Sequence, residues 1–304
     1  MIRPLLQYEG DEVEGRRGKL YVVATPIGNL GDLTDRARKV LTDVDLIAAE
    51  DTRETRHLLA HCGINTRLIA YHDHNESKAA ARLIESLESG LNLALVSDAG
   101  TPLISDPGYE LVATARARGL EVVPIPGANA AICALCAAGL PSDRFLFLGF
   151  PPRTSAQRRA WFAPLAREPA TLILYESGRR AIETLTDLAA ILGQDRRVVI
   201  ARELTKRFET FLSGSADALA RRMATDVEQQ LGELVILVEG NRSPQIADEA
   251  EQGRVLRVLA AELPLRQAAG LAARLTGGRK NDLYKLGLAL ELAAGPPDRQ
   301  AGPD

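Results

Sequence analysis

Three segments rich in polar residues, glycine and proline carry the residue types that most often bind small ligands. They are Thr25 to Asp32, Ser97 to Gly108 and Pro124 to Ala131. Each follows or completes an apolar run of β-strand character, and ligands in open parallel sheets bind beyond the carboxyl ends of the strands. Loops at those ends can direct backbone amides and side chains into one crevice. The three segments are therefore the first candidates for a binding site.

The segment Ser97 to Gly108 has the densest set of hydrogen-bonding groups. We favour a functional role for Asp98, because a carboxylate at a strand end can bind a ribose hydroxyl or an ammonium group. Asp106, next to Pro107, has the alternative of capping the following helix. The segment is thus either a ligand loop or an elaborate turn.

The other two segments are less specific. Gly28 and Gly31 permit close backbone approach, but their spacing matches neither the dinucleotide-binding pattern nor the P-loop pattern, and a tight turn is equally compatible with them. Gly127 and the small residues after it would let a helix N-terminus approach a ligand, although an Ala-rich packing helix has the same composition.

Other reactive residues favour structural roles. All four histidines lie between His57 and His74, but their spacing matches no zinc pattern, and the Cys-x-x-Cys pair that begins at Cys133 has no second pair, so we expect no metal site. Glu50 and Asp51 could bind a cation or act as a base, yet a solvated first helical turn is commoner.

Alternating strands and helices must position these loops. The predicted strands cover residues 20–24, 45–49, 92–97 and 121–125, and the predicted helices between them cover 34–41, 52–61, 77–89 and 108–118. This alternation predicts βαβ crossovers and a mostly parallel sheet. A helix at 128–138 and strands at 145–148, 171–175, 197–201 and 234–238 predict a second α/β domain, and three short helices follow at 254–262, 265–276 and 281–291.

The predicted organisation has six parts. They are an N-terminal tail (1–18), a first α/β domain (19–126), a second α/β domain (127–240), a linker (241–253), a helical module (254–291) and a C-terminal tail (292–304), with both tails expected to be disordered.

Composition fits a folded protein of two or more domains. The chain has 304 residues, 46% of them hydrophobic and 25% charged, with a net charge of -3, which excludes extensive disorder. No apolar run approaches the roughly 18 residues that span a bilayer, and the N-terminus lacks a secretory apolar region. Three cysteines cannot form a disulfide framework and suit a reducing compartment. We therefore expect a cytoplasmic protein with no membrane contact.

Seven ordered motifs together resemble the tetrapyrrole methylase superfamily, and in particular its members that methylate ribosomal RNA. The motifs are VVATPIGNLGDLT, AAEDTRETRHLL, LVSDAGTPLISDPG, PIPGANAAICAL, FLGFPPR, LYESGRR and ARELTKRFE. The match runs from about Leu20 to Gly240, and the last helices resemble the small helix-turn-helix module of the same enzymes. The first two loops depart from the G-x-G-P-G-D and G-D-P forms of members that make corrins or diphthamide, which argues against a porphyrinoid substrate.

The resemblance implies a fold, a donor and a substrate. The fold is the two-domain tetrapyrrole-methylase-like α/β fold, with a mostly parallel sheet in the N-terminal domain and a small C-terminal helical module. The donor is S-adenosylmethionine, held between the two α/β domains largely by backbone groups. The substrate is the ribose 2′-hydroxyl of cytidine 1402 of 16S ribosomal RNA, free or within the small ribosomal subunit, and the enzyme is expected to be a homodimer. The residues carried over as donor contacts are Ile27, Asp98, Thr101, Asn129, Ala130, Glu176 and Leu204. No catalytic residue follows from the motifs.

Basic segments could neutralise RNA phosphates despite the acidic total. Residues 153–180, 196–207 and 264–287 each carry a net charge of +4. The candidate RNA contacts are Arg153, Arg202, Lys206, Arg279, Lys280, Tyr284 and Lys285, with the tyrosine available to stack on a base. Two alternatives remain: a methyltransferase acting on a small molecule such as a tetrapyrrole, and an RNA-binding protein without activity.

Overall fold

The computed structural model describes residues 17–72, 76–241 and 249–292. The chain divides into two compact units, Met1–Gly240 and Asn241–Asp304. The border after Gly240 coincides with the predicted end of the second α/β domain. The division of the first unit at residue 126 stays a prediction, although this unit contains two separate sheets.

The first sheet is entirely parallel, with strand order β3-β2-β4-β1-β5. Its strands are β1 (Lys19–Val23), β2 (Leu46–Ala49), β3 (Leu68–Ala70), β4 (Leu93–Val96) and β5 (Glu121–Ile125). The helices are α1 (Asp35–Asp43), α2 (Thr52–His61), α3 (Glu76–Glu88) and α4 (Tyr109–Ala117), with a short 3₁₀ turn η1 (Leu30–Asp32). The expected alternation of strands and helices is confirmed in this part of the chain.

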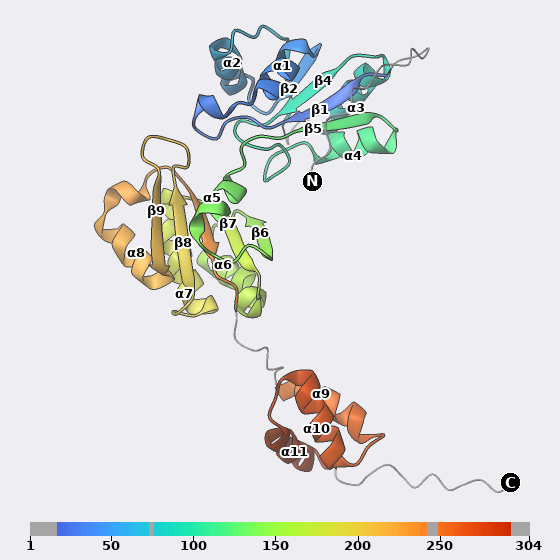
Figure 1. Ribbon diagram of the computed structural model, residues 1–304, viewed down its shortest axis with the longest axis vertical. Helices are drawn as coiled ribbons and strands as arrows, with labels where there is room; N and C mark the ends of the chain where they lie inside the picture. The colour runs from blue at the N-terminus through green and yellow to red at the C-terminus, as the bar shows by residue number, and fades with distance from the viewer. Residues whose placement is uncertain (1–16, 73–75, 242–248, 293–304) are drawn as a thin grey trace, which may run out of the picture. The chain divides into compact units, whose positions relative to one another are not determined.

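Both faces of the first sheet are covered, as Figure 1 shows: α1 and α2 lie on one side, and α3 and α4 on the other. The central strand β4 is buried at all four residues, because Leu93 and Leu95 face α3 and α4 while Ala94 and Val96 face α1 and α2. Continuous apolar strands of this kind are typical of parallel sheets with two covered faces.

The second sheet is mixed, with strand order β6-β7-β10-β8-β9. Its strands are β6 (Phe145–Gly149), β7 (Thr171–Ser177), β8 (Arg197–Arg202), β9 (Thr210–Ser215) and β10 (Glu233–Val238). Only β6 and β7 pair in parallel, and the remaining pairs are antiparallel. The helices are α5 (Ala130–Ala138), α6 (Ser155–Phe162), α7 (Gly178–Leu192) and α8 (Ala216–Thr225), with 3₁₀ turns η2 (Ala163–Arg167) and η3 (Val227–Gln230).

The two faces of the second sheet are covered unequally. The apolar helix α5 packs on one face, and the larger core between the sheet and α6, α7 and α8 lies on the other (Figure 1). The sequence did not indicate α6, α7, α8 or the edge strand β9.

The second unit is a helical module with its own core. It contains α9 (Glu249–Ala260), α10 (Leu265–Thr276) and α11 (Lys280–Ala289), which bury Leu256, Leu265 and Leu283 against a row of alanines on α10. Helix α9 begins at Glu249, inside the segment predicted as a linker, so that prediction is wrong for its last residues. In the described part of the chain, none of the helices is both long enough and apolar enough to cross a bilayer.

The ordered structure also extends by one or two residues into each predicted tail. Gly18 is buried, and its N–H donates to the carbonyl oxygen of Leu87 at 2.7 Å. Leu292 N donates to Gly287 O at 2.9 Å, which extends the helical module by one residue. Residues 1–16 and 293–304 lie outside the described part of the chain.

Candidate functional site

The loops that follow β1 and β4 are joined to each other by an isolated antiparallel bridge between Thr25 and Gly100. Thr25 N donates to Gly100 O at 2.8 Å, and Gly100 N donates to Thr25 O at 3.1 Å. The Thr25 hydroxyl is buried and donates to Ser97 O at 3.3 Å. Gly100 has a φ of +87°, a conformation that favours glycine. The two loops therefore form one continuous backbone surface at the carboxyl edge of the sheet.

Asp98 ties the end of β4 to the end of β2. Its Oδ1 accepts a hydrogen bond from Asp51 N at 2.8 Å, and its own N–H donates to Glu50 Oε2 at 3.3 Å. Asp51 caps α2 by accepting from Arg53 N, as expected for a residue in a first helical turn. Asp98 is exposed and lines the pocket described below, so it has a structural role at a position where it can also meet a ligand.

The end of the long second loop is anchored by an unexpected residue. Gly108, the N-cap residue of α4, has no side-chain cap, and Glu76 of α3 replaces one: its Oε1 accepts from Gly108 N at 3.1 Å and from the Tyr71 hydroxyl at 2.9 Å. The alternative that Asp106 caps α4 is wrong. Asp106 lines the pocket instead.

The third segment links the two sheets. The Thr101 hydroxyl donates to Ala128 O at 3.0 Å, which attaches the second loop to this segment. Asn129 caps α5, because its Oδ1 accepts from Ile132 N at 3.2 Å. The N–H of Ala131, the residue before Ile132, donates to the hydroxyl oxygen of Tyr175 on β7 at 3.2 Å. The N-terminus of α5 is thus held at the edge of the second sheet.

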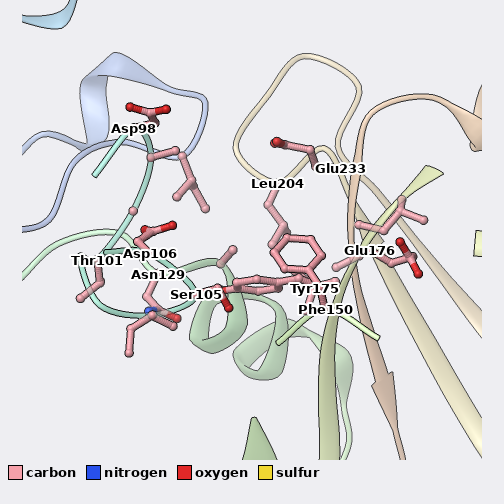
Figure 2. A pocket seen from close by; sticks show the side chains of 18 of the residues that line it. Asp98, Thr101, Ser105, Asp106, Asn129, Phe150, Tyr175, Glu176, Leu204 and Glu233 are labelled. Carbon is pink, nitrogen blue, oxygen red and sulfur yellow. The ribbon is translucent and has the colours of Figure 1, made fainter. Parts of the chain in front are cut away.

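These loops and the second sheet enclose a pocket of about 350 Å³ (Figure 2). All seven residues carried over as donor contacts line it: Ile27, Asp98, Thr101, Asn129, Ala130, Glu176 and Leu204. They come from the loops after β1 and β4, the start of α5, strand β7 and the turn after β8, segments that are far apart in the sequence. The structure therefore brings the whole predicted set to one place.

Two of the seven occupy the wall formed by the second sheet. Leu204 is 8% exposed and belongs to the core that packs against α5. Glu176 is buried, and its carboxylate is used within its own domain: Oε2 accepts from the Thr184 hydroxyl at 2.7 Å and lies 3.5 Å from Arg180 Nη2. Figure 2 shows this carboxylate directed away from the centre of the pocket. Glu176 can therefore meet a ligand through its backbone.

A strained turn after β8 holds Lys206 in the pocket wall. Glu203 (φ 51°) and Thr205 (φ 64°) adopt the left-handed region, which is unfavourable above all for a β-branched residue. Glu209 Oε2 accepts from Thr205 N at 2.7 Å and stabilises the turn. Lys206 Nζ donates to Glu203 Oε1 and to Glu233 Oε2, both at 3.0 Å.

These partners fix the charge of the lysine. Burial alone would lower the pKa of Lys206, but its hydrogen bonds to Glu233 and Glu203 hold that pKa above its ordinary value. Burial likewise would raise the pKa of Glu203, and the Glu233 N–H and Lys206 hold it below its ordinary value. The stem of Lys206 lies against Gly28, where an added Cβ would come within 2.4 Å of Lys206 Cγ.

The pocket is lined by apolar side chains and by several carboxyl groups. Its carboxyl residues are Glu50, Asp98, Asp106, Glu176, Glu203 and Glu233. Lys206 is the only basic residue among the described residues that line the pocket. The electrostatic environment therefore favours a ligand that carries positive charge.

Phe150, Tyr175 and Ser105 are among the lining residues that were not singled out from the sequence. Phe150 and Tyr175 have ring centroids 5.6 Å apart, and Ser105 lies on the second loop with a φ of 70°. Burial raises the pKa of Tyr175, so its hydroxyl is protonated at neutral pH. The motifs FLGFPPR and LYESGRR contained both aromatic residues, but only the pairing of β6 with β7 brings them together.

The predicted RNA contacts separate into three groups. Arg153, Arg279, Lys280, Tyr284 and Lys285 are exposed. Lys206 lies in the pocket wall, as described above. Arg202 is 8% exposed and its Nη2 donates to Phe208 O at 3.1 Å, so its burial is at odds with phosphate contact and we leave it out of the RNA surface.

The histidines and cysteines form no cluster in the described part of the chain. No group of three His, Cys, Asp or Glu residues within 17–72, 76–241 and 249–292 is arranged to hold a metal ion. Asp73 and His74, which belonged to the zinc alternative, lie outside the described residues.

Family models match most of the chain. A model described as Tetrapyrrole (Corrin/Porphyrin) Methylases matches residues 19–220, which include the first sheet, every strand of the second sheet except β10, and most of the pocket lining. A second model, described as RsmI C-terminal HTH domain, matches residues 246–291, which include the helical module.

Individual proteins agree with the family models. Ribosomal RNA small subunit methyltransferase I of Escherichia coli O157:H7 is 53% identical over 275 residues, covering 90% of this chain and 96% of that protein. The protein of the same name from Pseudomonas aeruginosa is 52% identical over 273 residues, covering 89% and 97%. A solved structure of uroporphyrin-III C-methyl transferase from Thermus thermophilus, complexed with S-adenyl homocysteine, matches with a TM-score of 0.51 at 18% identity, covering 72% of this chain and 97% of that one. The predicted fold class is confirmed, and the chain belongs to the tetrapyrrole methylase family of methyltransferases.

Proposed function

We propose that this chain transfers the methyl group of S-adenosylmethionine to the ribose 2′-hydroxyl of a cytidine in 16S ribosomal RNA, cytidine 1402 in the numbering of that RNA. The observation that carries the proposal is the convergence of all seven expected donor contacts on one pocket. Relatives named ribosomal RNA small subunit methyltransferase, about half identical over most of the chain, support the substrate class.

The pocket suits the proposed donor in size and charge. A volume of about 350 Å³ lies within the range of ligand sites in proteins, about 300–1,000 Å³. S-adenosylmethionine carries a sulfonium and an ammonium group, which the acidic lining favours. Small residues at Gly100, Ala130 and Ala201 leave room for a nucleoside beside exposed backbone groups.

When bound, S-adenosylmethionine supplies an electrophilic methyl group on a sulfonium that leaves as a neutral thioether, so no acid is needed for its departure. The protein must exclude water, hold the 2′-oxygen in line with the methyl carbon and sulfur, and let the hydroxyl lose its proton. Alignment of this kind can contribute several kcal/mol to the lowering of a barrier. Lys206 stays charged between its two carboxylate partners and can donate a hydrogen bond to an oxygen, but it cannot accept the proton.

We propose that the helical module supplies RNA affinity. Arg279, Lys280, Tyr284 and Lys285 are exposed at and after the start of α11. Lys280 and Tyr284 share one face of the helix, because residues four apart are neighbours on its surface. A cation for a phosphate and a ring for a base are the two elements that bind single-stranded RNA.

The proposal is tested with the full chain and a variant that ends at Gly240. Titration calorimetry measures the binding of S-adenosylmethionine, and mass spectrometry of nucleosides measures 2′-O-methylcytidine in small-subunit RNA incubated with donor and enzyme. We expect both proteins to bind the donor and only the full chain to methylate the RNA at an appreciable rate. Donor binding with transfer to a tetrapyrrole and not to RNA would support the small-molecule alternative. A chain that binds RNA and ignores the donor would be an RNA-binding protein without activity.

We also propose that the enzyme acts as a cytoplasmic homodimer. Its edge strand β6 exposes Phe145 and Leu146, and α5 exposes Ile132, which would favour contact with a second copy. One chain has a mass of 32.8 kDa, and light scattering after size exclusion is expected to give twice that mass. A mass of one chain at micromolar concentration would refute the dimer.

A further inference from the structure

An exposed aromatic ring stands at the edge of the pocket in a position that the donor contacts do not explain. Phe150 lines the pocket, yet 58% of it is exposed, whereas the donor contacts on the same wall, Glu176 and Leu204, are 2% and 8% exposed. Figure 2 shows its ring next to that of Tyr175, on the side of the pocket opposite Asp98. A ring in this position presents a flat apolar surface to a molecule that arrives from solvent.

The backbone is shaped to aim this ring. The pairing of β6 with β7 shifts register between Phe147 and Gly149, an irregularity of the kind that re-aims a side chain at the end of a strand. Gly149 has a φ of 65°, and an added Cβ would lie 3.3 Å from Ser105 Oγ of the second loop. The next residue, Phe150, is thereby turned out of the sheet and toward the pocket.

Two arginines then hold the turn that follows. Arg180 Nη2 donates to the carbonyl oxygens of Pro151 and Pro152 at 2.8 and 3.0 Å. Arg158 Nη1 donates to the carbonyl oxygens of Pro152 and Arg153 at 3.3 and 3.2 Å. The three consecutive backbone carbonyls of residues 151–153 are therefore each held by a guanidinium group.

The arrangement requires a charge inside the protein. Arg158 is completely buried, and its Nε donates to the buried carboxylate of Asp187 at 2.8 Å. Burying two charges is costly, and replacing a buried ion pair by apolar residues of similar volume costs a protein far less stability than removing one partner alone. The ion pair is explained if its function is to place the turn, and not merely to stabilise the fold.

We infer that Phe150 is the stacking platform for the base of the acceptor nucleotide, and that Arg158 and Arg180 are positioning residues that fix the turn presenting Phe150 and Arg153. The inference rests on the proposed function and adds the residue that receives the base. The exposed Arg153, three residues beyond the ring, would neutralise a phosphate of the same strand. A ring for the base beside a cation for the backbone is the usual arrangement for a single-stranded nucleotide.

The test uses the full-length enzyme with small-subunit RNA and measures kcat, KM for RNA and Kd for S-adenosylmethionine. We expect Phe150→Leu to raise KM for RNA about tenfold. The Kd for the donor should stay within about twofold of the wild-type value, and Phe150→Trp should restore KM. Phe208→Leu is the matched control, because Phe208 is 63% exposed and does not line the pocket, and it should leave all three constants unchanged.

Two further variants test the turn. Arg153→Gln should lower the slope of log KM against log salt concentration by about one, while Phe150→Leu leaves the slope unchanged. Arg180→Lys keeps a cation near Glu176, but its terminal nitrogen lies one bond closer to Cα than the Nη2 atom that holds both proline carbonyls. The variant should therefore raise KM for RNA while kcat at saturating RNA and the unfolding temperature stay close to wild type.

The outcomes separate the inference from the proposed function. If the wild-type enzyme methylates RNA and Phe150→Leu leaves KM for RNA unchanged, the platform is refuted and the proposed function stands. If Phe150→Leu raises the Kd for S-adenosylmethionine by the same factor as it raises KM for RNA, the ring stacks on the adenine of the donor and the inference is overturned. If the wild-type enzyme binds the donor but transfers no methyl group to RNA, the proposed function itself fails.

Discussion

Removing Asp187 should unfold the second sheet and its helices far more readily than removing Asp187 and Arg158 together. Asp187 is 2% exposed, and its carboxylate accepts hydrogen bonds from Arg158, Arg159 and Ser155 at 2.6 to 2.8 Å. In Asp187→Leu the fully buried Arg158 keeps its charge without this partner. Breaking such a pair costs about 3–5 kcal/mol of the free energy of unfolding. In Arg158→Met with Asp187→Leu no charge is stranded, so the loss should be smaller by about 2 kcal/mol or more.

Urea unfolding followed by tryptophan fluorescence measures this difference. Trp161 is the single tryptophan of the chain and packs against the core beneath α6, three residues from Arg158. With an m value of about 2 kcal/mol/M, a loss of about 4 kcal/mol lowers the urea midpoint by about 2 M. Equal midpoints for the single and the double variant would refute the reasoning, because they would mean that the stranded charge has no cost.

The same pair makes a prediction about pH. Burial alone would raise the pKa of Asp187, but hydrogen bonds from Arg159, Ser155 and Arg158 hold that pKa below its ordinary value. A carboxyl group whose pKa is lower in the folded state stabilises the protein above its unfolded pKa of about 3.9, and this contribution is lost as pH falls through the folded pKa. The difference in the free energy of unfolding between wild type and Asp187→Leu should therefore be constant from pH 6 to 8 and shrink below about pH 4. A difference that grew on acidification would contradict this sign.

Two other predictions concern the loops. Gly28→Val places a Cβ 2.4 Å from Lys206 Cγ, so the lysine must leave its carboxylate partners, and kcat/KM for methyl transfer should fall at least tenfold with little change in the unfolding temperature; unchanged kinetics would show that this close approach is unimportant. Glu76→Ala removes the acceptor shared by Tyr71 and Gly108, which should cost about 1–3 kcal/mol and weaken donor binding, whereas Glu76→Gln keeps a carbonyl acceptor and should recover most of both. Equal losses in the alanine and glutamine variants, seen in thermal unfolding and calorimetry, would count against this role.

The loops of the site could be predicted because their position depends on local patterns. Strands β1, β4 and β5 of the first sheet are short apolar runs followed by glycine and proline, and parallel strands place all such loops at one edge of a sheet. Family resemblance then supplied the contacts on the second sheet, Glu176 and Leu204, which no local pattern distinguishes from core residues.

Other features depend on pairings between distant segments and were missed for that reason. Strand β10 lies between β7 and β8, and this order cannot be deduced from the strands themselves. Arg158 is a charged residue in a helix and would be assigned to the surface, yet Asp187, 29 residues later, buries it. The ring of Phe150 reaches the pocket through a register shift against β7, which no sequence periodicity reveals.

The isolated β-bridge between Thr25 and Gly100 joins two loops, 75 residues apart in the sequence, into one structural unit. Inserting or deleting a residue in either stretch would break the reciprocal hydrogen bonds unless the other stretch changed with it. Substitutions of side chains at fixed loop length leave these backbone hydrogen bonds in place. An engineer who wishes to give this scaffold a different methyl acceptor should therefore transplant the two loops as a unit.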